Sequence, residues 1–195
     1  MNAVIITKRK RAELADLGQR RNAAKLPELT RRQSDVFTDT EVDVLGMYGE
    51  YTTGFYLGVG IDESIGPGGD KGVDHIWRGY SIATKFNHRW GGYLIVEERD
   101  GDDPANGIMC DLTCDIIILT HGRCDPTRQI CHCRREGGIY VAVAGWLRRH
   151  EFIDKMAFKN WGLGGRYVCQ CNQLRSMHTI WDECPAPKPT ADQPS

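Results

Sequence analysis

Residues 69–86 read GDKGVDHIWRGYSIATKF. Two runs with β-forming residues, GVDHIW and YSIATKF, flank the link Arg78-Gly79, and a two-residue link of this kind predicts a β-hairpin. Because side chains alternate between the two faces of a strand, Ala83 and Lys85 should share one face. Across a tight hairpin, Asp74 should lie close to both of them. The segment therefore predicts an acid and a lysine side by side on neighbouring strands.

An amphipathic helix is predicted just before the hairpin, in the run TDTEVDVLGMYGEYTTGFYLGVG, residues 38–60. Apolar residues recur at steps of three and four, Asp39 or Thr40 is the expected N-cap, and the helix should end at Gly58 or Gly60. Glu50 lies on this helix. An acid on a helix, an acid on a strand and a lysine on the next strand suit metal-dependent phosphodiester cleavage, in which carboxylates hold Mg²⁺ and the metal activates water.

The segment GDKGVDHIWRGYSIATKF resembles the signature of the PD-(D/E)XK nuclease superfamily, in the pattern of its compact phage and bacterial members. The run GMYGEYTTGFYLG is similar to the first core helix of that group. The runs CDIIILTHG, VAVAGWLRRHEFID and NWGLGGRYVCQCNQLRSM resemble its later strand, its GW helix and its closing segment. The resemblance covers about residues 40–181. It implies an α/β, restriction-endonuclease-like core with a central mixed β-sheet flanked by helices.

The resemblance also implies an activity, Mg²⁺-dependent endonucleolytic hydrolysis of DNA. Glu50, Asp74 and Lys85 would be the catalytic residues: Asp74 holds Mg²⁺, Lys85 positions water or stabilises charge, and Glu50 supports them. One departure stands out, because the family has Asp or Glu two residues before the lysine and this chain has Ala83. Three explanations stay open: an inactivating substitution, an acid that has moved to Glu97 or Glu98, or a natural pseudo-nuclease.

Two other functions are compatible with the sequence. The first is a non-catalytic pseudo-nuclease that binds DNA or protein, for example a phage factor that acts on a host complex. The second is a zinc-stabilised protein-interaction module whose likeness to nucleases is incidental. An acid at position 83 in the natural gene would favour the enzyme, and an alanine would favour the binding protein.

A zinc site is predicted in the polar connection between two apolar strands. His121, Cys124, Cys131 and Cys133 follow the order His-x2-Cys-x6-Cys-x-Cys, and zinc prefers such imidazole and thiolate ligands. The connection has few apolar residues, so a structural zinc ion would supply its folding energy. His132 lies between two of these ligands and should point away.

The remaining cysteines have a simpler expected role. Cys110 and Cys114 precede a buried strand, Cys169 and Cys171 share one face of the last strand, and Cys184 precedes the tail. Burial as small apolar side chains explains them best. Two alternatives stay open, completion of the zinc site or a second metal site, and an iron–sulfur cluster fits their arrangement poorly.

Basic residues supply the predicted contacts to nucleic acid. Arg78 and Arg89 flank the hairpin, and Arg134 and Arg135 lie in the polar connection. Such side chains could neutralise DNA phosphates; the alternative is an ordinary solvated face.

The composition supports a single compact domain with extra arms. The 195 residues are 41% hydrophobic and 26% charged, with a net charge of −1, which is ordinary for a globular chain. We expect a basic helical arm over residues 1–38, a nuclease-like domain over 39–184 with a zinc loop at 121–136, and a disordered proline-rich tail over 185–195.

The expected location and partners follow from the same composition. The sequence has no apolar run long enough for a membrane span and no signal pattern. A cytoplasmic protein of a bacterial or phage-infected cell is therefore expected. DNA is the expected partner, and cutting both strands would favour a homodimer.

Overall fold

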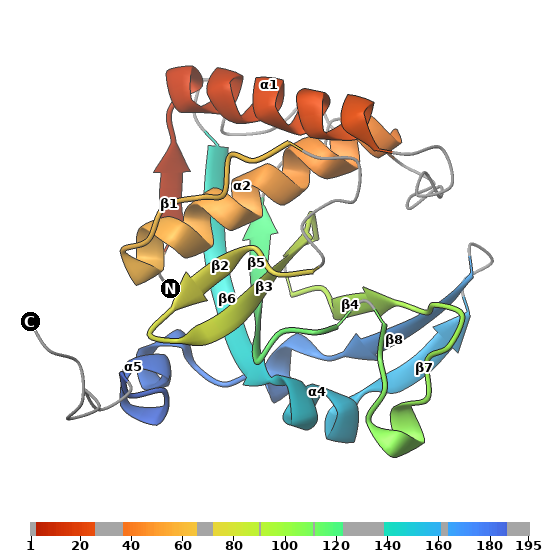
Figure 1. Ribbon diagram of the computed structural model, residues 1–195. Helices are drawn as coiled ribbons and strands as arrows, with labels where there is room; N and C mark the ends of the chain where they lie inside the picture. The colour runs from red at the N-terminus through yellow and green to blue at the C-terminus, as the bar shows by residue number, and fades with distance from the viewer. Residues whose placement is uncertain are drawn as a thin grey trace, which may run out of the picture.

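The computed structural model describes residues 3–25, 37–65, 72–89, 91–110, 112–122, 139–160 and 164–186 (Figure 1). These residues form an α/β fold, as predicted. The elements are, in chain order, β1 (Ala3–Ile6), α1 (Lys8–Ala24), α2 (Asp39–Leu57), β2 (His75–Trp77), β3 (Tyr80–Asn87), β4 (Leu94–Glu97), η2 (Pro104–Asn106), β5 (Ile116–Gly122), β6 (Ile139–Arg148), α4 (Arg149–Lys155), β7 (Ala157–Asn160), β8 (Gly165–Cys169), η3 (Cys171–Gln173), η4 (Met177–Thr179) and α5 (Ile180–Glu183).

The strands form two sheets. The larger sheet has the order β1-β6-β5-β3-β2, and the smaller has the order β4-β8-β7. In the larger sheet β3 and β5 are parallel, whereas the pairs β1–β6, β5–β6 and β2–β3 are antiparallel. The predicted mixed sheet is thus present, and helices flank it (Figure 1).

The predicted hairpin is confirmed. His75 pairs with Ile82 and Trp77 pairs with Tyr80. The two link residues, Arg78 and Gly79, have φ values of 51° and 81°. Positive φ at both central residues gives the turn whose twist matches the strands of a two-residue hairpin.

The helix before the hairpin is confirmed with a small shift at its start. Thr38 is the N-cap and forms a capping box with Glu41, in place of the expected Asp39 or Thr40. The helix ends at Gly58, which adopts the left-handed conformation with φ of 72°, as is common for glycine after a last helical turn.

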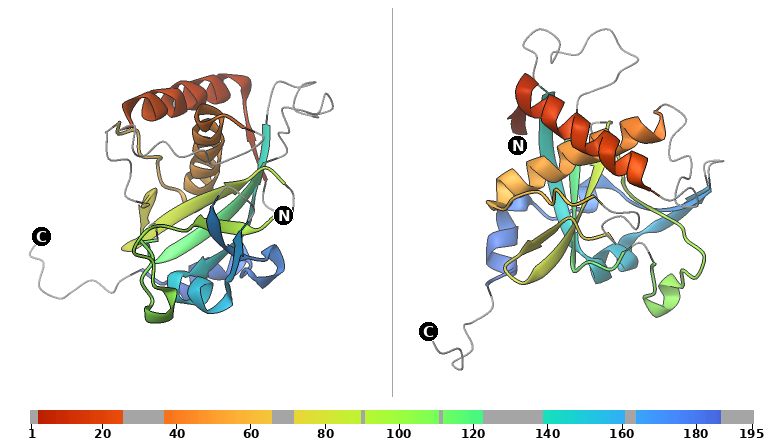
Figure 2. Two further views of the ribbon diagram at one scale, coloured as in Figure 1. Left: turned by 90° about the vertical axis from the view of Figure 1, so that its right-hand side faces the viewer. Right: turned by 45° about the horizontal axis from the view of Figure 1, so that its top comes forward.

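Both faces of the larger sheet are covered by buried apolar clusters. On one face, Ala83, Ile117 and Leu147 pack against Leu94 and Phe152, so that the smaller sheet and α4 cover this face. Helices α1, α2 and α5 pack over the other face, and Figures 1 and 2 show α1 lying across α2 on that side. The core of the molecule is therefore two apolar layers separated by one sheet.

Two segments differ from the prediction because long-range pairing overrides their local pattern. Our prediction places no strand before the first helix, yet Ala3–Ile6 pairs with β6 as an edge strand. The resemblance also implies a GW helix in the run VAVAGWLRRHEFID, but β6 continues to Arg148 because Trp146 pairs with Ile118 of β5. The helix that follows, α4, is correspondingly short.

Helix α2 approaches the sheet most closely at a glycine. A Cβ on Gly49 would lie 2.7 Å from Oγ1 of Thr120 and 3.3 Å from Cβ of Phe86. Real Cβ atoms do not come so close to their neighbours, so the absence of a side chain at this position sets the distance between helix and sheet.

Substitution of this glycine should therefore destabilise the fold. We expect Gly49→Ala to lower the free energy of unfolding by about 1–3 kcal/mol, because the added methyl group overpacks the helix–sheet interface. The matched control is Gly46→Ala on the same helix, where nothing lies within 4 Å of the added Cβ. That variant should gain roughly 0.5–1 kcal/mol from better helix propensity. Urea denaturation measures both, and equal stability of the two variants would contradict the close packing.

In the part of the chain that the structure describes, no helix combines the length and the apolar character needed to cross a bilayer. The C-terminal tail from residue 187 lies outside the described residues.

Candidate active site

The hairpin brings Asp74 and β3 together, as predicted. The backbone N–H of Asp74 donates to the carbonyl oxygen of Ile82 at 2.8 Å. The backbone N–H of Thr84 donates to carboxylate Oδ2 of Asp74 at 2.5 Å. The Asp74 side chain thus continues the β2–β3 ladder by one bond, and this fixes its carboxylate beside residues 83–85.

Ala83 belongs to the core. It is 1% exposed and packs in the apolar cluster between the two sheets. Strand alternation places Lys85 on the same face of β3 as Ala83, and Lys85 is partly exposed. Position 83, where the resemblance implies an acid, is therefore filled by a small apolar side chain within a packed layer.

Cys114, which the sequence predicts as a buried thiol but does not assign to this site, lies beside this pair. It is 1% exposed, and burial raises the pKa of its thiol to about 11, an effect that the Asp74 charge reinforces and the Lys85 charge opposes. Because both charges act on this thiol, Asp74, Lys85 and Cys114 lie close to one another. Such a thiol stays protonated at neutral pH and behaves as a small apolar side chain.

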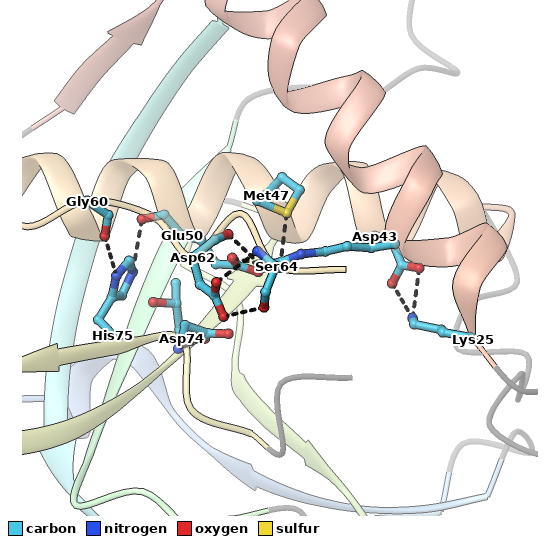
Figure 3. Close-up of polar contacts among 11 residues, drawn as sticks. Lys25, Asp43, Met47, Glu50, Gly60, Asp62, Ser64, Asp74 and His75 are labelled. Carbon is cyan, nitrogen blue, oxygen red and sulfur yellow. Dashed lines mark hydrogen bonds and ion pairs between the residues drawn. The ribbon is translucent and has the colours of Figure 1, made fainter. Parts of the chain in front are cut away.

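Glu50 has a different environment from the one we predict. Its carboxylate accepts hydrogen bonds from Nη1 of Arg21 at 3.0 and 3.2 Å. The same arginine donates from Nη2 to the Asp62 carbonyl at 2.6 Å and contacts the Met47 sulfur at 3.3 Å. Figure 3 shows Glu50, Asp62 and Met47 around this contact. Helix α1 thus supplies the cation that neutralises Glu50.

Glu50 and Lys85 lie on different sides of β3. Helix α2 packs against Thr84 and Phe86, since both lie 3.3 Å from a Cβ built on Gly49. Lys85 alternates with these two residues and so faces the other side of the strand. Of the three predicted catalytic residues, the structure brings Asp74 and Lys85 together and leaves Glu50 with Arg21.

His75 joins the helix to the hairpin. Its Nδ1 lies 3.1 Å from the carbonyl oxygen of Gly60, and its Nε2 lies 3.1 Å from that of Glu50 (Figure 3). Burial lowers the pKa of His75, and its contacts with the two carbonyl groups oppose this shift. These contacts hold the start of β2 against the end of α2, and thereby fix the position of Asp74.

The described acids leave a magnesium ion with one candidate protein ligand at this site, Asp74. Mg²⁺ requires octahedral oxygen coordination and is usually held by one or two carboxylates. Asp74 already uses Oδ2 for a hydrogen bond, Ala83 offers no oxygen, and Glu50 is paired with Arg21. Within the described ranges, no three His, Cys, Asp or Glu side chains gather as a metal-binding group.

The predicted zinc site lies largely outside the described residues, which include only His121 of its four ligands. His121 lies near the end of β5 and is 3% exposed. Its Nδ1 accepts a hydrogen bond from the Gly91 amide at 3.4 Å, and burial lowers its pKa. Cys124, Cys131 and Cys133 follow beyond the last described residue of this strand.

The other cysteines are mostly buried, as expected. Cys114, Cys169 and Cys184 are buried free thiols, Cys171 is partly buried and Cys110 is exposed. Burial raises the pKa values of Cys169, Cys171 and Cys184.

The predicted DNA contacts have unequal environments. The Arg78 guanidinium lies 4.8 and 4.9 Å from the rings of Trp77 and Trp181, and it donates to the carbonyl oxygens of Trp181 and Cys184. These contacts attach the C-terminal helix α5 to the hairpin, a role that the sequence did not indicate. Arg89 is exposed just beyond β3, while Arg134 and Arg135 lie outside the described residues.

Comparisons with known proteins add no relative: no protein-family model, curated protein or solved structure matches this chain.

Proposed function

We propose that this chain is a DNA-binding protein on a restriction-endonuclease-like scaffold whose hydrolytic centre is incomplete. One observation carries the proposal: the hairpin retains Asp74 beside Lys85, while the intervening Ala83 is packed in the core. Glu50, the other expected acid, has Arg21 as its cation. The arrangement keeps the frame of a phosphodiesterase site, with Asp74 as the single candidate carboxylate ligand for Mg²⁺.

We place the DNA contacts Arg89, Arg134 and Arg135 at one end of the larger sheet. Asn87 at the end of β3 pairs with His121 near the end of β5, and Arg89 is exposed just beyond that end. Strand β6 starts at the same end, since Gly122 pairs with Val141. The segment between β5 and β6, which carries Arg134, Arg135 and the proposed zinc-binding cysteines, therefore leaves and re-enters the sheet next to Arg89.

A salt titration tests the binding. With a labelled duplex in fluorescence anisotropy, we expect affinity to fall on the order of 10- to 100-fold between about 50 and 200 mM salt, because each neutralised phosphate releases counterions. Arg89→Ala should reduce the slope of log affinity against log salt by about 0.9. The matched control is Lys155→Ala on α4, at the opposite end of the sheet, which should bind as the unmodified chain does.

The same preparation separates binding from hydrolysis. Incubated with DNA and Mg²⁺, the unmodified chain should leave the DNA intact. Absence of salt-dependent binding would contradict the proposal and favour a protein-interaction module.

The second candidate function is the Mg²⁺-dependent DNA endonuclease itself, and the Asp74–Lys85 pair favours it. It predicts that the unmodified chain cuts DNA with Mg²⁺ and loses this activity in Lys85→Ala. Such cleavage would overturn the incomplete-centre proposal.

A further inference from the structure

The first turn of α1 carries four consecutive cations, Lys8–Arg11, and no acid. The amino-terminal end of a helix carries a partial positive charge, so cations there are electrostatically unfavourable. Helix α1 as a whole has six cations and two acids, although the chain has a net charge of −1. The stability of the helix does not account for this concentration of positive charge.

Most of these cations face solvent. Lys8, Arg9 and Arg11 are exposed, and the Arg9 side chain is 91% exposed. Lys10 pairs with Glu13 at 2.6 Å, and Arg9 also contacts Glu13 at 3.1 Å. One acid is thus shared by two cations, so the turn keeps a surplus of positive charge.

One aromatic side chain of α2, Tyr51, lies next to this turn, and a second, Phe55, lies beside Tyr51. Nζ of Lys10 is 5.6 Å from the centroid of the Tyr51 ring. The ring of Phe55, one turn further along α2, is 6.4 Å from the ring of Tyr51 at an interplanar angle of 38°. Phe55 is 65% exposed, so burial in the core does not explain a large apolar side chain here. Glu63 also interacts with Lys10.

We propose that Lys8, Arg9, Arg11, Tyr51 and Phe55 form a surface that binds single-stranded DNA, an inference that rests on the proposed DNA-binding function. The lysine and arginine side chains bind the phosphates of the DNA backbone. The exposed aromatic ring stacks on a base, and unpaired bases offer a free face for stacking, whereas bases in a duplex are already stacked. The surface lies on the helical side of the sheet, at the amino-terminal end of α1 (Figure 2).

The test compares single-stranded and duplex DNA on the full chain. With a labelled oligothymidine in fluorescence anisotropy, Phe55→Ala should weaken binding about 5- to 100-fold, the loss expected for one stacked base. The matched control is Phe158→Ala on β7, which is 54% exposed and should bind normally. The double variant Lys8→Ala/Arg11→Ala should lower the salt slope by about 1.4, twice the value per phosphate for single strands.

The outcomes separate this inference from the function it rests on. If duplex DNA binds through Arg89 but Phe55→Ala and the double variant bind oligothymidine normally, the single-strand surface is overturned and DNA binding stands. If Phe55→Ala weakens duplex and single-strand binding equally, stacking on unpaired bases is overturned. If neither DNA form binds, both proposals fall. Thermal melting should show all variants folded, because the substituted side chains are exposed.

Discussion

Ala83→Asp should give the protein Mg²⁺-dependent cleavage of DNA that the unmodified chain lacks. The hairpin already fixes Asp74 beside β3 through the 2.5 Å bond from the Thr84 amide. Position 83 lies on the face that also carries Lys85. A second carboxylate there would supply the oxygen ligands that one aspartate cannot, and two carboxylates are a common protein contribution to a magnesium site.

The substitution should also change stability in a way that reports metal binding directly. Ala83 is 1% exposed, so without metal the new carboxylate should lower the free energy of unfolding by about 3–5 kcal/mol, the cost of an uncompensated buried charge. Mg²⁺ should then raise the melting temperature, because an ion that binds only the folded state stabilises it. Ala83→Asn is the control, because asparagine has nearly the same shape as aspartate but carries no charge. This variant should show neither the Mg²⁺-dependent rise in melting temperature nor cleavage.

The two measurements make the result decisive. Cleavage with a Mg²⁺-dependent melting shift supports a nuclease-like scaffold that lost one ligand. A folded Ala83→Asp protein that shows no Mg²⁺ shift and cuts neither single-stranded, duplex nor branched DNA would remove the main support for the nuclease interpretation.

The sequence predicted the hairpin site well because its rules are local. A two-residue link fixes the register, and alternation then fixes which side chains share a face. Asp74, Ala83 and Lys85 therefore lie where the sequence places them. The same local rules gave the position of α2 to within two residues at its start.

The partners of those residues could not be predicted, because they come from distant parts of the chain. Arg21 belongs to a helix that the sequence presents as a basic arm, and its pairing with Glu50 follows from how α1 packs on α2. Arg78 is an apparent DNA contact in the hairpin turn, but α5 places two carbonyl groups and Trp181 around it. The local sequence around an arginine is the same whether its side chain binds a phosphate or a carbonyl group of the protein.

The pair formed by Arg21 and Glu50 should behave as a structural ion pair. Both side chains are largely buried, at 16% and 9% exposure. We expect Arg21→Met to lower the free energy of unfolding by about 2–4 kcal/mol, because it leaves a buried carboxylate without its cation. Glu50→Met should cost less, since the Arg21 guanidinium still donates to the Asp62 carbonyl.

Two further variants distinguish the loss of a buried charge partner from the loss of side-chain packing. Arg21→Met/Glu50→Met should recover most of the lost stability, because replacing both charges by apolar groups is often nearly neutral. The control is Arg20→Ala, which breaks a pair with Asp16 whose side chains are 56% and 66% exposed, and it should cost at most about 0.5 kcal/mol. Urea denaturation measures all four. If Arg21→Met is as stable as Arg20→Ala, Glu50 does not depend on Arg21 for its charge, and its assignment as an acid neutralised within the fold would be wrong.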